Sequence, residues 1–183
     1  MIDKLEGIYR INRYYKQLTE RAVEQVKERD LHKKIDGFDH SAAVLMKHIS
    51  GYLRSTWTNF RTEDGEKPWR NRDSEFVDDF SNRGEVISLW NEGWDVLFEA
   101  LESVKEEELY NIIYVRNEGI TIMDGFVKSL AHVSYHSGQI VQISKYFAGN
   151  RWKTLSIPKG KTDEYNEKMF NRDKSIGMYK DRF

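Results

Sequence analysis

The chain has 183 residues, the size of a single domain, and its 29 lysines and arginines nearly balance its 30 aspartates and glutamates, so it carries no basic footprint for nucleic acid. It has no cysteine, which excludes disulfides, thiolate metal ligands and a cysteine nucleophile, and which fits a cytoplasmic protein. Its longest apolar run, residues 42–46, is far shorter than the roughly 20 residues of a membrane span, and its charged N-terminus does not resemble a signal peptide, so we expect no membrane partner.

Two amphipathic helices are predicted in the first third of the chain, because apolar residues recur there at spacings of three and four. The first follows the apolar positions from Ile8 to Val26, and we interpret the polar residues 28–37 after it as a loop. The second begins near Asp39 or Ser41, either of which can cap free backbone N–H groups, and its apolar positions extend to Phe60.

Residues 62–81 interrupt the helical pattern with the turn chemistry of Asp-Gly and Lys-Pro pairs. A segment of this length in a compact domain is either a functional loop over a site or a solvated connector, and the sequence leaves both open. A third helix follows from Ser81, with Trp90 and Trp94 among its apolar positions and Gly93 as an unfavourable interior residue.

A short β-hairpin is predicted over residues 110–122, because β-branched and aromatic residues flank a turn that contains Gly119. Thr121 or Asp124 then caps a fourth helix, which extends to about Phe147. The chain after this helix is mostly polar, and we interpret it as a tail.

Together these elements predict an all-α fold, a four-helix bundle with a short β-hairpin before its last helix. The bundle covers about residues 1–149 and a C-terminal extension covers about residues 150–183, so we treat the chain as one domain. We expect the first part of the extension to pack on the body and its end to be loose or to dock on a partner subunit. Tryptophan and tyrosine are abundant, which fits a homodimer and fits a dense core equally well.

Three histidines are candidate metal ligands. His132 and His136 lie four residues apart in the fourth helix, so both rings project from one side and can approach one cation. His48 has apolar neighbours one turn before and after it, so it points inward, where it needs a hydrogen-bond partner or a metal. The same pattern would also arise if His132 and His136 were ordinary surface residues and His48 were a buried residue with a hydrogen-bond partner. We expect His32 and His40, in or beside a polar connector, to be solvated.

Candidate pocket residues flank these ligands. Gln139, one turn beyond His136, can orient that ring or contact a ligand, or it can be an ordinary surface residue. Tyr52, one turn after His48, can line a pocket or pack in the core. We expect Gly138 to permit close packing between helices. No base like the glutamate of an H-E-x-x-H motif accompanies the pair, which argues against a metal-dependent hydrolase, and the sequence identifies no catalytic residue.

The segment from His132 to Ile140, with His48 upstream, resembles the H-x-x-x-H-x-G-Q-I signature of the DinB/YfiT-like family of bundle metalloproteins. The hairpin before the last helix fits the same family, and the ending from Trp152 to Lys161 resembles a branch of it without an assigned function. The likeness covers about residues 1–162, although the 62–81 segment departs from the compact family pattern.

This resemblance implies a four-helix bundle, often a homodimer, with a divalent metal ion, zinc or nickel, held by His48, His132 and His136. Some relatives are S-transferases that join a small cytoplasmic thiol such as bacillithiol to an electrophile, and others are isomerases that use mycothiol. The resemblance therefore predicts a metal-dependent S-transferase with a small-molecule substrate and a low-molecular-weight thiol as cosubstrate. Two alternatives stay open: a metal-dependent hydrolase, and a non-catalytic homodimeric bundle that binds a metal.

Overall fold

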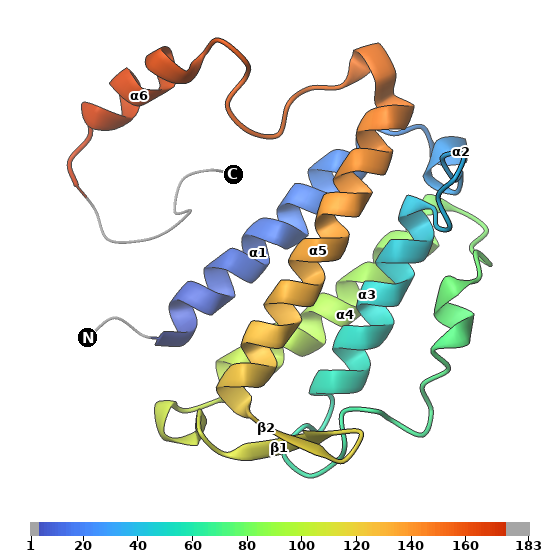
Figure 1. Cartoon of the computed structure of the whole chain (residues 1–183), viewed down its shortest axis with the longest axis vertical. Coiled ribbons are helices and arrows are strands. Elements are labelled where there is room, and N and C mark those ends of the chain that lie inside the picture. The colour runs from blue at the N-terminus through green and yellow to red at the C-terminus, as the bar shows by residue number, and fades with distance from the viewer. Residues whose placement is uncertain (1–3, 175–183) are drawn as a thin grey trace.

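The protein is mostly helical in the computed structural model, which describes residues 4–174 (Figure 1). In this part of the chain there are six α-helices, three short 3₁₀ turns and one two-stranded antiparallel hairpin. The elements follow in the order α1 (Lys4–Val23), α2 (Glu28–Leu31), α3 (Ala42–Trp57), η1 (Asp73–Phe76), α4 (Arg83–Ser103), η2 (Glu106–Glu108), β1 (Ile112–Val115), β2 (Glu118–Thr121), α5 (Ile122–Ala148), η3 (Gly149–Arg151) and α6 (Thr162–Phe170).

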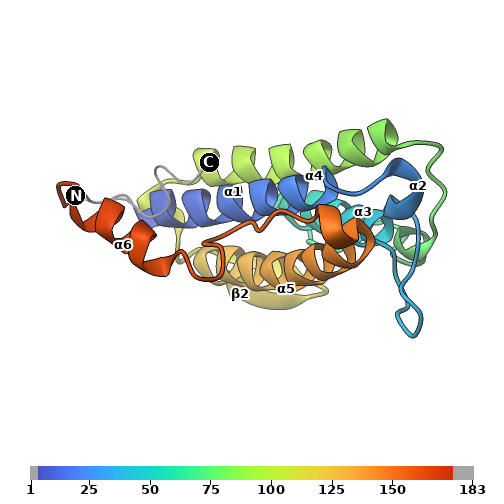
Figure 2. The ribbon, with the colours of Figure 1, turned by 90° about the horizontal axis from the view of Figure 1, so that it is seen from above.

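The four long helices, α1, α3, α4 and α5, pack against one another around one apolar core. Helix α3 packs on both α4 and α5, and α1 packs mainly on α5, so that α4 and α5 lie on opposite sides of the molecule (Figure 2). Trp90, Trp94 and Phe126 are among the largest fully buried side chains of this core. Because α3 and α5 are direct neighbours, residues on their facing sides can form a shared site.

Side-chain caps fix where the helices begin. The hydroxyl groups of Ser41 and Thr121 each accept a hydrogen bond from the backbone N–H three residues further on, so both predicted starts are confirmed. Helix α4 begins at Arg83, two residues after the predicted start at Ser81, and is capped by Asn82. Helix α5 ends at Gly149, whose φ of +55° is a conformation that glycine adopts without steric cost.

Two glycines have roles that differ from those expected. A Cβ atom at Gly93 of α4 would lie 2.6 Å from the Cα atom of Ser50, so this glycine permits the close contact between α4 and α3. Gly138 of α5 is exposed, and a Cβ atom there would meet no other atom within 4 Å. The expectation that Gly138 serves close helix packing is therefore wrong, and Gly93 has that role instead.

The predicted hairpin is confirmed, and it supports the 62–81 segment. Strands β1 and β2 meet at a turn in which Arg116 and Asn117 have positive φ angles. The backbone N–H groups of these two residues donate to the carboxylate of Asp64 at 2.8 and 2.9 Å. On its other side the segment contacts α3 through η1. The 62–81 segment is therefore attached to both the hairpin and α3, and it buries Lys67 and Glu75 while many of its other residues are exposed.

Two further segments contain short helices that the sequence did not predict. The predicted loop over residues 28–37 includes the single turn α2, which buries Leu31 completely. The C-terminal extension includes α6, which buries no residue. The side chain of Gln25 hydrogen-bonds to the backbone of Lys153, so the start of the extension is attached to the body. The predicted loose or docking end lies partly in residues 175–183, outside the described part. Within residues 4–174, no helix has both the length and the apolar character that crossing a membrane requires.

Candidate metal centre

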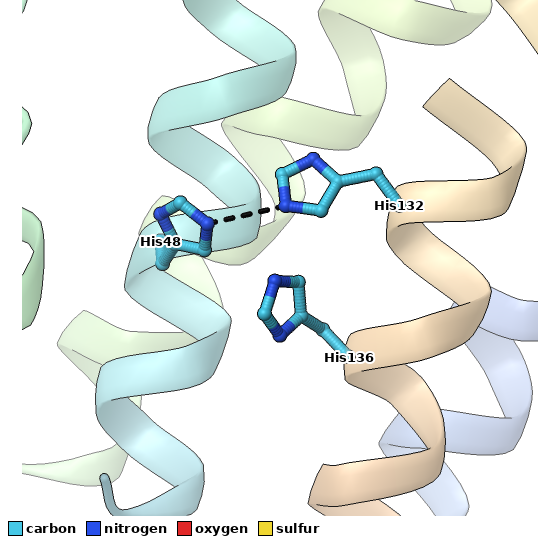
Figure 3. Close-up of side chains that lie close together, drawn as sticks. All are labelled: His48, His132 and His136. Carbon is cyan, nitrogen blue, oxygen red and sulfur yellow. Dashed lines mark hydrogen bonds between the residues drawn. The ribbon is translucent and has the colours of Figure 1, made fainter. Parts of the chain in front are cut away.

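Helices α3 and α5 bring the three predicted histidines together. His48 comes from α3, and His132 and His136 come from consecutive turns of α5, with their rings turned toward one another (Figure 3). One ring nitrogen of each histidine lies within 4.8 Å of the corresponding nitrogens of the other two. Two nitrogens bound to one tetrahedral zinc ion are about 3.3 Å apart, given Zn–N bonds of about 2.0–2.1 Å. Small side-chain rotations therefore bring this set to metal-binding distances.

His48 is already in the orientation that a metal ligand needs. It is buried, and its Nδ1 atom lies 2.8 Å from a carboxylate oxygen of Glu75. Because an ionised carboxylate only accepts hydrogen bonds, Nδ1 carries the ring hydrogen and the lone pair is on Nε2. That Nε2 atom lies 3.2 Å from the Nε2 atom of His132. The free nitrogen of His48 thus faces the other two histidines.

His136 is oriented by a partner on its own helix. Its Nδ1 atom lies 2.6 Å from the side-chain oxygen of Gln139, while the Gln139 amide nitrogen donates to the Tyr135 hydroxyl at 3.4 Å. In this arrangement the amide oxygen accepts the Nδ1–H of His136 and leaves Nε2 as its free nitrogen. Of the three roles considered for Gln139, this hydrogen bond fits the one that orients the ring, and the side chain is also exposed at the surface.

Tyr52 packs edge-on against His132. The ring centroids are 4.1 Å apart with an interplanar angle of 77°, and the Tyr52 hydroxyl lies 3.1 Å from the Ser129 hydroxyl. The indole N–H of Trp57 donates to the same Ser129 oxygen at 3.0 Å. Burial raises the pKa of Tyr52, which keeps its phenol protonated at neutral pH. Tyr52 therefore joins the wall of the site to the core.

The environment keeps the histidines of α5 uncharged. Burial, reinforced by His136 and His48, lowers the pKa of His132 to about 3. Burial also lowers the pKa of His136, and the hydrogen bond with Gln139 offsets this only in part. Both rings are therefore neutral at pH 7, which is the form that binds metal ions.

Sequence reasoning missed an ion pair beside His48. The carboxylate of Glu75, in η1, accepts hydrogen bonds from the Arg70 guanidinium at 2.8 and 3.1 Å, and both side chains are only 7% exposed. Burial raises the pKa of Glu75, but the hydrogen bonds from His48 and Arg70 outweigh it, so that pKa lies below its ordinary value. The 62–81 segment that carries both residues has no periodic pattern, so nothing in the sequence marked them.

The expectation that His40 is solvated is wrong. His40 is half-buried, and its ring lies against Phe76, which in turn stacks on His48 with ring centroids 4.7 Å apart. His32, which we also expected to be solvated, is half-buried and hydrogen-bonds to Asp78.

A pocket of about 190 Å³ lies next to this cluster. His40 and neighbouring residues of the loop before α3 line one side of it, and Gln139 and Ile143 of α5 line the other. Because Gln139 also holds His136, the pocket and the histidine cluster share a wall. The three histidines are not among the residues that line this pocket, and Gln139 is the residue that connects it to them.

The comparison with protein families matches residues 3–161 to the family described as "Protein of unknown function (DUF1572)". Comparisons with curated proteins and with solved structures gave no match. The family match covers most of the chain, including the hairpin and all three histidines, so the chain belongs to this family. Its description states no activity, and the likeness to the DinB/YfiT-like family stays a prediction.

Proposed function

We propose that this member of the DUF1572 family is a metal-dependent S-transferase with the four-helix-bundle architecture of the DinB/YfiT-like family. His48, His132 and His136 would hold a zinc or nickel ion, because imidazole nitrogens are suitable ligands for both metals. The observation that carries the proposal is the convergence of these rings from two helices. Two of them have Nδ1 hydrogen-bonded, so that Nε2 is free.

The chemistry follows from the donor set. When bound, such an ion would supply Lewis acidity, which lowers the pKa of a coordinating thiol so that its proton is released to solvent at neutral pH. The chain has no cysteine, so the thiol is a small cosubstrate. Its sulfur forms a bond to an electrophilic carbon, and the leaving group departs with the electron pair of the bond that breaks.

The residues of the chain prepare the site for this reaction. Glu75 and Gln139 keep hydrogens on the Nδ1 atoms of His48 and His136, so that both Nε2 lone pairs are available. Tyr52 supports the ring of His132 from its edge. The pocket that Gln139 lines is the proposed place for a small substrate.

Elemental analysis of protein purified without a histidine tag tests the metal directly, with about one zinc or nickel ion per chain expected. His132→Ala and His136→Ala should lose the ion and the consumption of small thiols across a panel of electrophiles. His32→Ala is the matched control, because His32 pairs with Asp78 and should keep both properties. Thiol transfer that persists in metal-free His132→Ala protein would refute the proposal.

The same samples separate the alternatives. Ester hydrolysis without a thiol would indicate a metal-dependent hydrolase instead. Loss of folded structure on chelation, with no turnover of any substrate, would indicate a structural metal. We also propose a homodimer, which the family resemblance supports. A solution mass by light scattering equal to that of one chain, 21.7 kDa, would overturn that part.

A further inference from the structure

We infer that Glu75 is a positioning residue of the metal centre, and that the 62–81 segment is therefore part of the site. By accepting the Nδ1–H of His48, Glu75 fixes the rotation of that ring and makes Nε2 its ligand atom. The inference rests on the proposed metal centre.

The first observation is how completely the Glu75 carboxylate is engaged. One oxygen accepts from His48 at 2.8 Å and from Arg70 at 3.1 Å, and the other accepts from Arg70 at 2.8 Å. Glu75 is only 5% exposed, and a carboxylate so buried loses hydration that only such partners replace. The geometry thus leaves this group little freedom to move, which is what holding a ring requires.

The second observation is a glycine that makes room for this carboxylate. Gly51 lies on α3 three residues after His48, and a Cβ atom there would be 2.6 Å from the Cδ atom of Glu75. A glycine inside a helix costs about 1 kcal/mol relative to alanine. The close approach of Glu75 to the α3 backbone explains why a glycine stands at this position.

The third observation is that the neighbouring residue holds the face of the same ring. Phe76 stacks on His48 with an interplanar angle of 29°, while Glu75 holds the ring edge. Two consecutive residues of η1 therefore restrict both the tilt and the rotation of the imidazole. A merely solvated loop would place neither of them there.

A line of alternating charges extends from this point to the hairpin. Arg70 donates to Glu66 at 3.0 Å, and Arg116 at the hairpin turn donates to the same Glu66 oxygen at 3.1 Å. Arg116 and Glu66 are more exposed than Arg70 and Glu75, so their pair contributes less. We expect the loss of Zn²⁺ affinity on substitution to be largest at Glu75, smaller at Arg70 and smallest at Glu66.

Competition for Zn²⁺ against a chromophoric chelator tests the inference on the full chain. Glu75→Ala should bind Zn²⁺ about 10–100-fold more weakly than wild type, the usual effect of losing such a partner. Glu75→Gln keeps the shape and one acceptor, so it should lose less affinity but change the absorption spectrum of bound Co²⁺. Asp79→Asn is the matched control, because Asp79 is in the same segment and pairs with Lys47 instead. It should bind Zn²⁺ as wild type does.

Gly51→Ala provides a second, independent test, since its Cβ atom displaces the Glu75 carboxylate without changing the identity of any histidine or of Glu75. It should weaken Zn²⁺ binding as Glu75→Ala does, with metal-free unfolding measured in parallel to exclude loss of the fold. If Glu75→Ala fails to fold, the Zn²⁺ affinities of Glu75→Gln and Gly51→Ala test the inference instead. Folded variants that bind Zn²⁺ as tightly as wild type would overturn the inference.

Nitrogen NMR of His48 distinguishes failure of the inference from failure of the proposed function. In metal-free wild type the ring should be protonated on Nδ1, and in Glu75→Ala it should populate both neutral forms. If wild type binds no divalent ion, the proposed function fails. The difference in ring protonation between wild type and Glu75→Ala still shows whether Glu75 orients the ring. An unchanged His48 spectrum in Glu75→Ala would overturn the inference whether or not a metal binds.

Discussion

The contact between α3 and α4 leads to a prediction that opposes helix propensity: Gly93→Ala destabilises the protein. Propensity alone favours alanine inside a helix by about 1 kcal/mol. The new Cβ atom would lie 2.6 Å from the Cα atom and 2.7 Å from the hydroxyl of Ser50, so the two helices must separate. Such overpacking costs about 1–3 kcal/mol, and weakening the hydrogen bond from Ser50 to the Leu89 carbonyl adds about 1 kcal/mol. The net loss is about 1–3 kcal/mol.

Thermal and urea unfolding of metal-free protein, followed by circular dichroism, measures this loss. At about 2–4 °C per kcal/mol for a chain of this size, the melting temperature of Gly93→Ala should fall by several degrees. Gly138→Ala is the matched control, because that position is inside α5 and open to solvent, and it should gain up to about 1 kcal/mol. A Gly93→Ala protein as stable as Gly138→Ala would refute the reasoning.

Two more predictions concern stability. The folded chain lowers the pKa of His132 to about 3 and lowers that of His136 below the ordinary 6.5. As the pH falls below about 6.5, these histidines therefore take up protons in the unfolded chain but not in the folded chain. Stability should therefore decrease on acidification, and the melting temperature of metal-free wild type should drop more between pH 7 and 5 than that of His132→Asn; equal drops would contradict this. Ser41→Ala removes the cap of α3 and should cost about 1 kcal/mol in urea unfolding, whereas Ser41→Asn should retain most of it, and indistinguishable variants would show that the cap is dispensable.

The long helices were predictable because the spacing of their apolar residues can be read within each segment alone. Burial of the resulting apolar face then stabilises each helix. Ser41 and Thr121 are caps that act within one helical turn, so their positions could also be read from the sequence. The meeting of His48 with His132 and His136 was predictable in part for a related reason. Their place on the helix surface follows from the 3.6-residue period, whereas the assignment of all three to one site came from the family resemblance, because periodicity does not show which helices are neighbours.

The surroundings of the site could not be predicted in this way. Glu75 and Arg70 lie in a segment without periodicity, and their positions depend on the hairpin, more than 30 residues further along the chain. Helix α2 is too short to give a periodic signal. The role of Gly51 depends on a carboxylate 24 residues away, so it is visible only in three dimensions.

The charge of the proposed centre suits an incoming anionic nucleophile. Three imidazoles bind as neutral ligands, and the carboxylate of Glu75 is neutralised by Arg70, so the protein contributes no net charge beside a bound dication. Catalytic zinc sites of many hydrolases instead include a carboxylate ligand, which offsets part of the charge of the ion. A centre with its full charge stabilises an incoming anion more strongly, and both a thiolate and a hydroxide are such anions. Without Arg70, the buried Glu75 carboxylate would add an uncompensated negative charge beside His48 and would weaken the attraction of the centre for any incoming anion.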